Sequence, residues 1–191
     1  VLPADFHLLK GTIHVFPVPE DSKSRFRVIK HPRDYNITHG SDTVRHCGNS
    51  TRRSARHAVL RARGAICLDI QAYFDLIPLS LAASRHQAFA ADGRVFINRR
   101  LPMGGRHSTQ IATAITRVLL AFSHENVTVD FATDNIRFAS MDREAAVTAA
   151  WTFVLRCREA GIPLNELDVT SCTRDDVAAL WNSESSDFLG E

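Results

Sequence analysis

Residues 67–79 of this chain are CLDIQAYFDLIPL, in which an apolar run leads into two carboxylates, an aromatic pair and a proline. The run begins at Ala65 and is nearly continuous to Ile70, which is typical of a strand buried on both faces. Asp69 lies inside this run, and an unpaired buried carboxylate would cost several kcal/mol unless it met a cation or a metal. A salt-bridged aspartate at a strand end would explain the same pattern, so the other segments must decide.

The composition describes an ordinary globular protein. The chain has 191 residues, 45% of them hydrophobic, which allows one domain or two small lobes with a buried core. No apolar run approaches the roughly 18 residues of a membrane span, and there is no signal segment or lipidation motif. We therefore expect an intracellular protein, nuclear or cytoplasmic, with no membrane contact. The four cysteines are widely scattered, which favours reduced thiols.

The net charge of +2 conceals an asymmetry. Residues 23–63 carry eleven Lys and Arg against two acids, whereas residues 141–191 carry four Arg against ten acids. A solvated loop is the simpler explanation of the basic region. The functional hypothesis is a face that binds phosphate groups, with an affinity that falls steeply as salt rises.

The segments before the central strand predict a basic β-structure. Residues 1–20 alternate loosely and predict a strand or hairpin, and residues 25–30 alternate basic and apolar positions as a strand with outward arginines does. Residues 31–36 predict a turn. Residues 37–56 show no period, which predicts a long surface loop.

The segments after the central strand predict a helix, a turn and a second helix. Residues 79–91 are alanine-rich and predict a short helix, followed by a turn at 92–93 and a strand at 94–98. Residues 101–108 (LPMGGRHS) contain two glycines, which let the backbone approach a ligand closely before a helix begins near Ser108. Apolar residues at helical spacing form its expected core-facing stripe: Ile111, Ile115, Val118, Leu119 and Phe122.

The last third of the chain predicts a β-hairpin and two helices. Residues 127–131 and 136–138 alternate strictly around the turn pair Asp134-Asn135, which places Asp134 at the hairpin tip. A helix capped by Asp142 is expected to run to about residue 160 and to end at glycine. A second helix is expected over residues 173–181, where a capping box begins.

Taken in order, three segments resemble the central motifs of reverse transcriptases: residues 69–79 (DIQAYFDLIPL), 101–108 (LPMGGRHS) and 132–140 (ATDNIRFAS). Residues 25–36 (RFRVIKHPRDYN) look like the fingers motif that precedes them. Residues 188–190 look like the start of the primer-grip hairpin. Among subfamilies, the chain looks closest to retrotransposon enzymes.

This resemblance implies an α+β fold of the right-hand polymerase type, with fingers and an antiparallel palm sheet packed on helices. By resemblance, the fingers comprise residues 1–62 and 80–105. The palm comprises residues 63–79 and 106–191 and ends at the start of the primer-grip-like hairpin. The chain begins at Val1, so we expect a fragment of a longer polypeptide, without the thumb and any nuclease domain. The resemblance implies no oligomeric state.

The implied activity is RNA-directed DNA polymerisation, in which two Mg²⁺ or Mn²⁺ ions join a deoxynucleotide to a primer 3′-hydroxyl on an RNA or DNA template. Two-metal sites hold their ions roughly 3.5–4 Å apart, and hard cations of this kind prefer carboxylate oxygens. By resemblance, Asp69 and Asp134 would bridge the metals, and the backbone carbonyl of Ile70 would be a further ligand.

The resemblance also assigns a nucleotide site and a nucleic-acid site. Phe74 matches the aromatic residue that blocks a ribose 2′-hydroxyl, and Arg27 matches the fingers arginine that meets the triphosphate of a dNTP. Met103 and Gly104 match positions that shape the nucleotide pocket. The remaining candidates, for phosphate or template contact, are Lys30, Arg33 and Arg106. Taken singly, each of these arginines would be interpreted as solvated surface, and Asp75 receives no role.

One departure from the family pattern concerns catalysis. Where the family has two adjacent acids after an aromatic residue, this chain has Ala132-Thr133-Asp134-Asn135. Asn135 offers a carbonyl oxygen without charge, so we expect weaker metal binding and a reduced activity. Related polymerase folds work with Asp-Asn at this position, so we expect catalysis to be retained, with loss of activity as the alternative. Asp130 lies four residues before Asp134 and is not expected to compensate.

Three other interpretations compete with this one. A catalytically silent palm would hold RNA through its basic fingers, and an RNA-templated RNA polymerase would share the metals but accept ribonucleotides, which Phe74 argues against. A zinc site could be imagined from the side chains of the basic loop: His39, His46, Cys47 and His57. Their spacing matches no standard zinc pattern.

Overall fold

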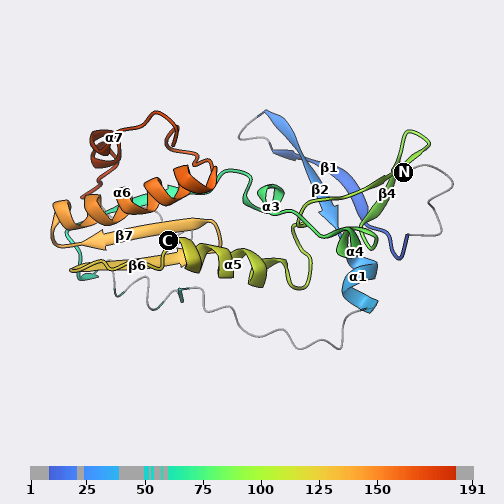
Figure 1. Cartoon of the computed structure of the whole chain (residues 1–191), viewed down its shortest axis with the longest axis horizontal. Coiled ribbons are helices and arrows are strands. Elements are labelled where there is room, and N and C mark those ends of the chain that lie inside the picture. Colours follow the sequence, from blue (N-terminus) through green and yellow to red (C-terminus); the bar gives the residue numbers. More distant parts are fainter. Residues whose placement is uncertain are drawn as a thin grey trace. The chain divides into compact units, whose positions relative to one another are not determined.

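The computed structural model describes residues 9–20, 24–38, 50–51, 53, 57 and 60–183 (Figure 1). The chain divides into two compact units, one of residues 1–46 and 72–111 and the other of residues 47–71 and 112–191. The names fingers and palm, with the boundaries given above, stay predictions. No helix among the described residues is long and apolar enough to cross a bilayer.

The second unit is built on a three-stranded antiparallel sheet. Its strands are β3 (Gly64–Asp69), β6 (Val127–Ala132) and β7 (Asn135–Ser140), in the order β3-β7-β6. Strand β3 buries Ile66 and Leu68 fully on one face, whereas Cys67 and Asp69 on the other face are only partly buried, so the expected burial of both faces is incomplete. This arrangement confirms the predicted class of an α+β fold with antiparallel sheets.

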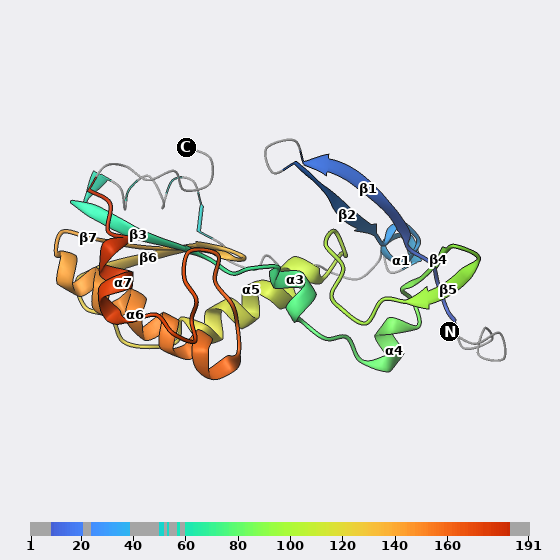
Figure 2. The same ribbon diagram turned by 90° about the horizontal axis from the view of Figure 1, so that it is seen from above.

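Helix α6 (Arg143–Ala160) packs on one face of this sheet, as Figure 2 shows. The rings of Phe138 in β7 and Phe153 in α6 lie 5.8 Å apart and both are fully buried. Cys157 is also fully buried on α6, and this burial raises the pKa of its thiol to about 12. Cys172 is likewise a buried free thiol.

The ends of α6 carry the stop and start signals that the sequence predicts. The Asp142 carboxylate accepts a hydrogen bond from the Glu144 N–H at 2.9 Å, and Gly161 ends the helix in the left-handed region with φ 65°. Helix α7 (Arg174–Ala179) begins at the predicted capping box of Thr173 and Asp176.

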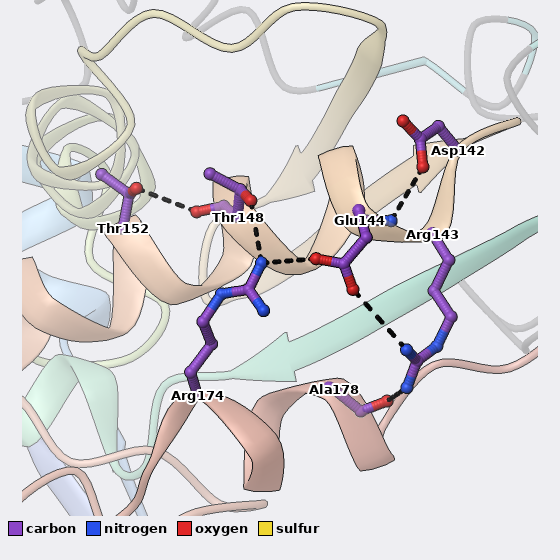
Figure 3. A network of polar contacts seen from close by, with 7 residues as sticks. All are labelled: Asp142, Arg143, Glu144, Thr148, Thr152, Arg174 and Ala178. Carbon is purple, nitrogen blue, oxygen red and sulfur yellow. Dashed lines mark hydrogen bonds and ion pairs between the residues drawn. The ribbon is translucent and has the colours of Figure 1, made fainter.

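Two arginines join α6 to α7 (Figure 3). Arg143 donates to the Ala178 carbonyl at 2.8 Å, and Arg174 donates to the Glu144 carboxylate at 2.7 Å. Because the Arg143 contact satisfies a carbonyl at the end of α7, it neutralises part of the negative pole of that short helix. The two helices therefore form one layer.

The first unit contains two small antiparallel ribbons and several short helices. Strands β1 (His14–Glu20) and β2 (Arg25–His31) form one ribbon, and β4 (Ala88–Ala91) and β5 (Arg94–Ile97) form the other. Among the described residues of this unit, the helices are α1 (Arg33–Thr38), α3 (Tyr73–Leu76) and α4 (Leu81–Ser84). Helix α5 (Ser108–Leu119) begins in this unit, and its residues from 112 onward belong to the second.

Two local predictions were wrong. The helix expected over residues 79–91 is only α4, because Ala88–Ala91 forms β4 and pairs with β5 across Asp92-Gly93, whose positive φ angles suit a tight hairpin turn. These strand hydrogen bonds override the helix propensity of the alanines. The turn expected at residues 31–36 is mostly α1, and the carbonyl of Pro32, just before this helix, accepts from the Asn36 N–H at 3.0 Å.

The predicted core stripe of α5 was also partly wrong. Leu119 is buried, but Ile111 and Val118 are exposed, Val118 by 69%. The buried face instead consists mainly of small residues: Ala112, Thr113 and Thr116. Small side chains allow the helix backbone to approach a neighbouring segment closely, which an apolar count along the sequence does not detect.

Gly64 offers a test of the packing along β3. A Cβ atom at this position would lie 2.5 Å from both the Asn182 carbonyl oxygen and Trp181 Cζ2. We expect Gly64→Ala to lower the free energy of unfolding by about 1–3 kcal/mol through overpacking, measured by urea denaturation followed by circular dichroism.

Gly11→Ala is the matched control, because its Cβ would lie 3.3 Å from the nearest atom, the His86 carbonyl oxygen. We expect a smaller loss there. An equal or larger loss for Gly11→Ala would contradict the packing described around Gly64.

Candidate active site

Strand pairing brings the predicted catalytic residues of the second unit to one end of its sheet. Asp69 is the last residue of β3 and is paired with Asn135, the first residue of β7. Immediately beyond this pair, the Ile70 N–H donates to the Asp134 carbonyl at 3.0 Å. Backbone pairing between the two strands therefore makes Asp69, Ile70, Asp134 and Asn135 neighbours in space, although Ile70 and Asp134 are 64 positions apart in the sequence.

The hairpin tip lies one residue earlier than predicted. Its two-residue turn is Thr133-Asp134, and Asn135 pairs with both Ala132 and Asp69 as part of the sheet. The expected turn pair Asp134-Asn135 was wrong because Thr133 adopts the left-handed φ of 60° that a tight hairpin requires. Asp134 lies in the turn, as expected.

Thr133 is a β-branched residue in a conformation that costs about 1–2 kcal/mol. Its carbonyl accepts a hydrogen bond at 2.5 Å from the hydroxyl of Thr116, which is fully buried on α5. Strain of this kind persists only where the surroundings hold it. The contact with α5 therefore helps to fix the residue before Asp134.

One carboxylate oxygen of Asp69 has a hydrogen-bond donor, and the other has none among the described residues. Its Oδ2 atom accepts a hydrogen bond from Asn165 Nδ2 at 2.5 Å. Its Oδ1 atom is buried and has no hydrogen-bond partner among the described residues. A buried carboxylate oxygen without a donor is costly, so this atom is suited to receive a cation.

Asn165 and Glu166 were missed by the sequence analysis. The Glu166 carboxylate accepts a hydrogen bond from the Asp69 N–H at 2.9 Å. Partial desolvation raises the pKa of Glu166; the hydrogen bonds from the Asp69 and Glu166 N–H groups oppose this rise, and the Asp69 charge adds to it. No sequence signal indicates either residue, since they follow Pro163 in an ordinary loop after α6.

The oxygen atoms at this end of the sheet are of the chemical types that bind divalent cations. Two carboxylates, an uncharged side-chain amide and backbone carbonyls are the ligands that Mg²⁺ and Mn²⁺ accept. Within the described ranges, no group of three or more His, Cys, Asp or Glu side chains is arranged to hold a metal. A cation here would depend on Asp69 and Asp134, with neutral oxygens completing its shell.

Asp130 does not take part in this group. It is buried on β6 and accepts a hydrogen bond at 2.8 Å from Arg137, its cross-strand partner on β7. Because removing either charge would leave the other buried and uncompensated, this pair is fixed in the sheet. The expectation that Asp130 lies away from the hairpin tip agrees with this position.

In the first unit, the glycine turn is tied to α1. The Asn36 side chain donates to the Gly104 carbonyl at 2.9 Å and accepts from the Arg106 N–H at 2.8 Å. Gly104 has φ 84°, which favours glycine, and Met103 beside it is 48% exposed. The two predicted pocket residues, Met103 and Gly104, thus lie in a turn whose backbone is held by hydrogen bonds to the Asn36 side chain.

The predicted phosphate-binding residues have diverse surroundings. Lys30 forms an ion pair with Asp75, which gives a partner to an acid that the sequence left without a role. Arg27 lies on the exposed β1-β2 ribbon, 3.8 Å from Glu20, and Arg33 is exposed on α1. Phe74 is half-buried in α3, with its ring 6.4 Å from that of Tyr73.

The predicted site residues thus fall into two groups, each described within its own unit. Asp69, Ile70, Asp134 and Asn135 form one group in the second unit, and the other candidates belong to the first. The zinc hypothesis and the primer-grip segment at residues 188–190 lie largely outside the described residues, because only His57 of that set is described.

No protein-family model matches the sequence, and no curated protein is significantly similar to it. Solved structures do match. Native prototype foamy virus protease-reverse transcriptase has 22% identity and a TM-score of 0.65, over 82% of this chain and 20% of its own. The foamy viral protease-reverse transcriptase dRH in complex with double-stranded DNA has 21% identity and a TM-score of 0.63, over 80% of this chain and 26% of its own.

A likeness at this level of identity concerns the fold. The chain has a reverse transcriptase-like fold, and it spans between a fifth and about a quarter of the length of these two neighbours.

Thr133 allows a test of the strain at the hairpin tip. We expect Thr133→Gly to raise the free energy of unfolding by about 0.5–1 kcal/mol, because relief of the left-handed strain exceeds the entropy cost of glycine. The control is Ala132→Gly at the end of β6, which should lower stability. Urea denaturation measures both, and a destabilised Thr133→Gly would contradict the strained turn.

Proposed function

We propose that this chain is the fingers and palm region of an RNA-directed DNA polymerase from a retroelement of the retrotransposon type. The observation that carries the proposal is the end of the β3-β7 pair, where Asp69 pairs with Asn135, the Ile70 N–H donates to the Asp134 carbonyl, and a carboxylate oxygen of Asp69 is buried without a donor among the described residues. The reverse transcriptase-like fold supports it. The chemistry is nucleotidyl transfer to a primer 3′-hydroxyl.

Two Mg²⁺ or Mn²⁺ ions, when bound, would activate the attacking oxygen and stabilise the leaving phosphates. Asp69 and Asp134 would hold them, with the Ile70 carbonyl as a further ligand. Asn135 brings an oxygen without charge to the position of the second acid, so the site has a lower negative charge and a lower metal affinity than an Asp-Asp pair would give. We therefore expect an enzyme that needs a raised metal concentration.

The first unit would bind the incoming dNTP and the template-primer. Arg27 would meet the triphosphate, and Phe74 would lie against the sugar. Met103 and Gly104 would line the base pocket, where the turn held by Asn36 leaves the space beyond the Gly104 Cα open. The remaining basic residues would contact nucleic acid: Lys30, Arg33 and Arg106.

The foamy viral neighbour that was solved with double-stranded DNA supports a template-primer as the partner of this chain.

The ion pair of Lys30 with Asp75 neutralises part of the lysine charge within the protein. We therefore assign Lys30 a weaker role in phosphate binding than the exposed Arg33.

Primer extension tests the proposed activity. We expect the natural polypeptide that carries this sequence to add dNTPs to a DNA primer on an RNA template, and chelation of the metal by EDTA to stop the reaction. Asp69→Asn should reduce the rate by about 100-fold or more, because it removes a charge that holds the metals.

Asp175→Asn, an acid in the first turn of α7, is the control and should leave the rate unchanged. A polypeptide that incorporates no dNTP while binding RNA in a salt-sensitive manner would contradict the proposal and favour the silent RNA-binding palm. An activity that survives Asp69→Asn would contradict the assignment of Asp69 as a metal ligand.

Sugar selection tests the assignment of Phe74. We expect Phe74→Val to raise the efficiency of ribonucleotide incorporation relative to deoxynucleotides by about tenfold or more, because the smaller side chain leaves room for a 2′-hydroxyl. Competition between rATP and dATP in single-nucleotide extension measures the ratio.

Phe96→Val, on a partly exposed phenylalanine of β5, is the matched control and should keep the original ratio. An unchanged ratio in Phe74→Val would identify Phe74 as a packing residue beside Tyr73.

A further inference from the structure

The edge of β3 that faces away from β7 is covered, at its Asp69 end, by residues 163–166. Ile70 and Leu164 form an antiparallel bridge. The Gln71 N–H donates to the Pro163 carbonyl at 3.0 Å, and the Asn165 N–H donates to the Asp69 carbonyl at 2.9 Å. This segment therefore continues the sheet for about two residues, at the point where the candidate metal ligands lie.

Two consecutive residues of this segment hold both the backbone and the side chain of Asp69. Asn165 donates through its amide group to Oδ2 at 2.5 Å, and the Glu166 carboxylate accepts from the Asp69 N–H at 2.9 Å. The carboxylate torsion of an aspartate is broad and nearly two-fold. The contact with Asn165 selects one orientation and leaves Oδ1 as the oxygen without a donor.

The segment that carries Asn165 is itself fixed to α6. Ile162 donates to the Cys157 carbonyl at 2.8 Å as the chain leaves the helix. Further along, Arg158 donates to the Val169 carbonyl and, at 2.7 Å, to the Cys172 carbonyl. Asn165 thus stands on a loop that is attached by hydrogen bonds to the last turn of α6 at both of its ends.

We propose that Asn165 is a positioning residue, which anchors one carboxylate oxygen of Asp69 so that the other is presented to a divalent cation. This inference rests on the proposed function. An amide suits the task because its NH₂ group donates without bringing a charge, whereas Lys or Arg at this position would oppose the cation. Outer contacts of this kind orient metal ligands and typically change metal affinity by 10- to 100-fold when removed.

A matched control lies on the same edge of β3. Asn182 exchanges backbone hydrogen bonds with Ala65, at 2.9 and 3.0 Å, near the opposite end of the strand from Asp69. Both asparagines are exposed on the protein surface. Replacing either with alanine removes the same atoms from the same strand edge, but only Asn165 contacts Asp69.

Binding of Mn²⁺ to the natural polypeptide, followed by electron paramagnetic resonance, is the primary measurement. We expect Asn165→Ala to weaken the Asp69-dependent Mn²⁺ affinity by about tenfold, and Asn165→Leu, which keeps the branched side-chain shape without the donor, to do the same. Asn182→Ala should leave the affinity unchanged. Circular dichroism establishes that each variant is folded.

Primer extension supplies a second readout. In Asn165→Ala, the metal concentration for half-maximal rate should rise by a similar factor, and the rate at saturating metal should return toward that of the unmodified protein. A merely structural role would lower the rate at every metal concentration.

The outcomes separate the inference from the proposed function. Unchanged Mn²⁺ affinity in folded Asn165→Ala and Asn165→Leu, together with loss of binding in Asp69→Asn, would overturn the positioning role and leave the polymerase intact. Absence of any Asp69-dependent Mn²⁺ binding in the unmodified protein would overturn both.

Discussion

The antiparallel pairing of β3 with β7 ends at Asp69 and Asn135, and the Ile70 N–H extends it by one hydrogen bond to the Asp134 carbonyl. This register determines which residues meet at the end of the sheet. A shift of one residue would turn Asp69 to the opposite face and bury a different set of side chains. The candidate site is therefore a consequence of strand register, which the fully buried face of β3 holds in place.

Three sets of contacts hold the backbone in place at that end of the sheet. The contact between Thr116 and Thr133 holds the hairpin tip, the buried pair of Asp130 and Arg137 ties β6 to β7, and residues 163–166 close the outer edge of β3. A site built on strands with supporting hydrogen bonds keeps its ligands more precisely than a site on loops. Amid these contacts, the Oδ1 atom of Asp69 stays buried without a hydrogen-bond donor among the described residues.

Local patterns predicted most of the elements of the second unit. The apolar run before Asp69, the alternation around the hairpin and the capping residues of α6 and α7 each depend on contacts within a few residues, so a single sequence carries them. The failures have tertiary causes. Strand pairing across Asp92-Gly93 replaced the expected helix, and the buried face of α5 followed the small residues that let it pack closely.

The sequence by itself predicted the kind of site, because the order of Asp69, the glycine turn and Asp134 resembles one family and because Asn135 stands where a second acid is usual in that family. Only the tertiary structure brought in Asn165 and Glu166, from a loop almost a hundred residues after Asp69. Their residue types and spacing are unremarkable along the chain. Their role depends on a bridge between strand edges, and such long-range hydrogen bonds have no periodicity or local propensity that a sequence could display.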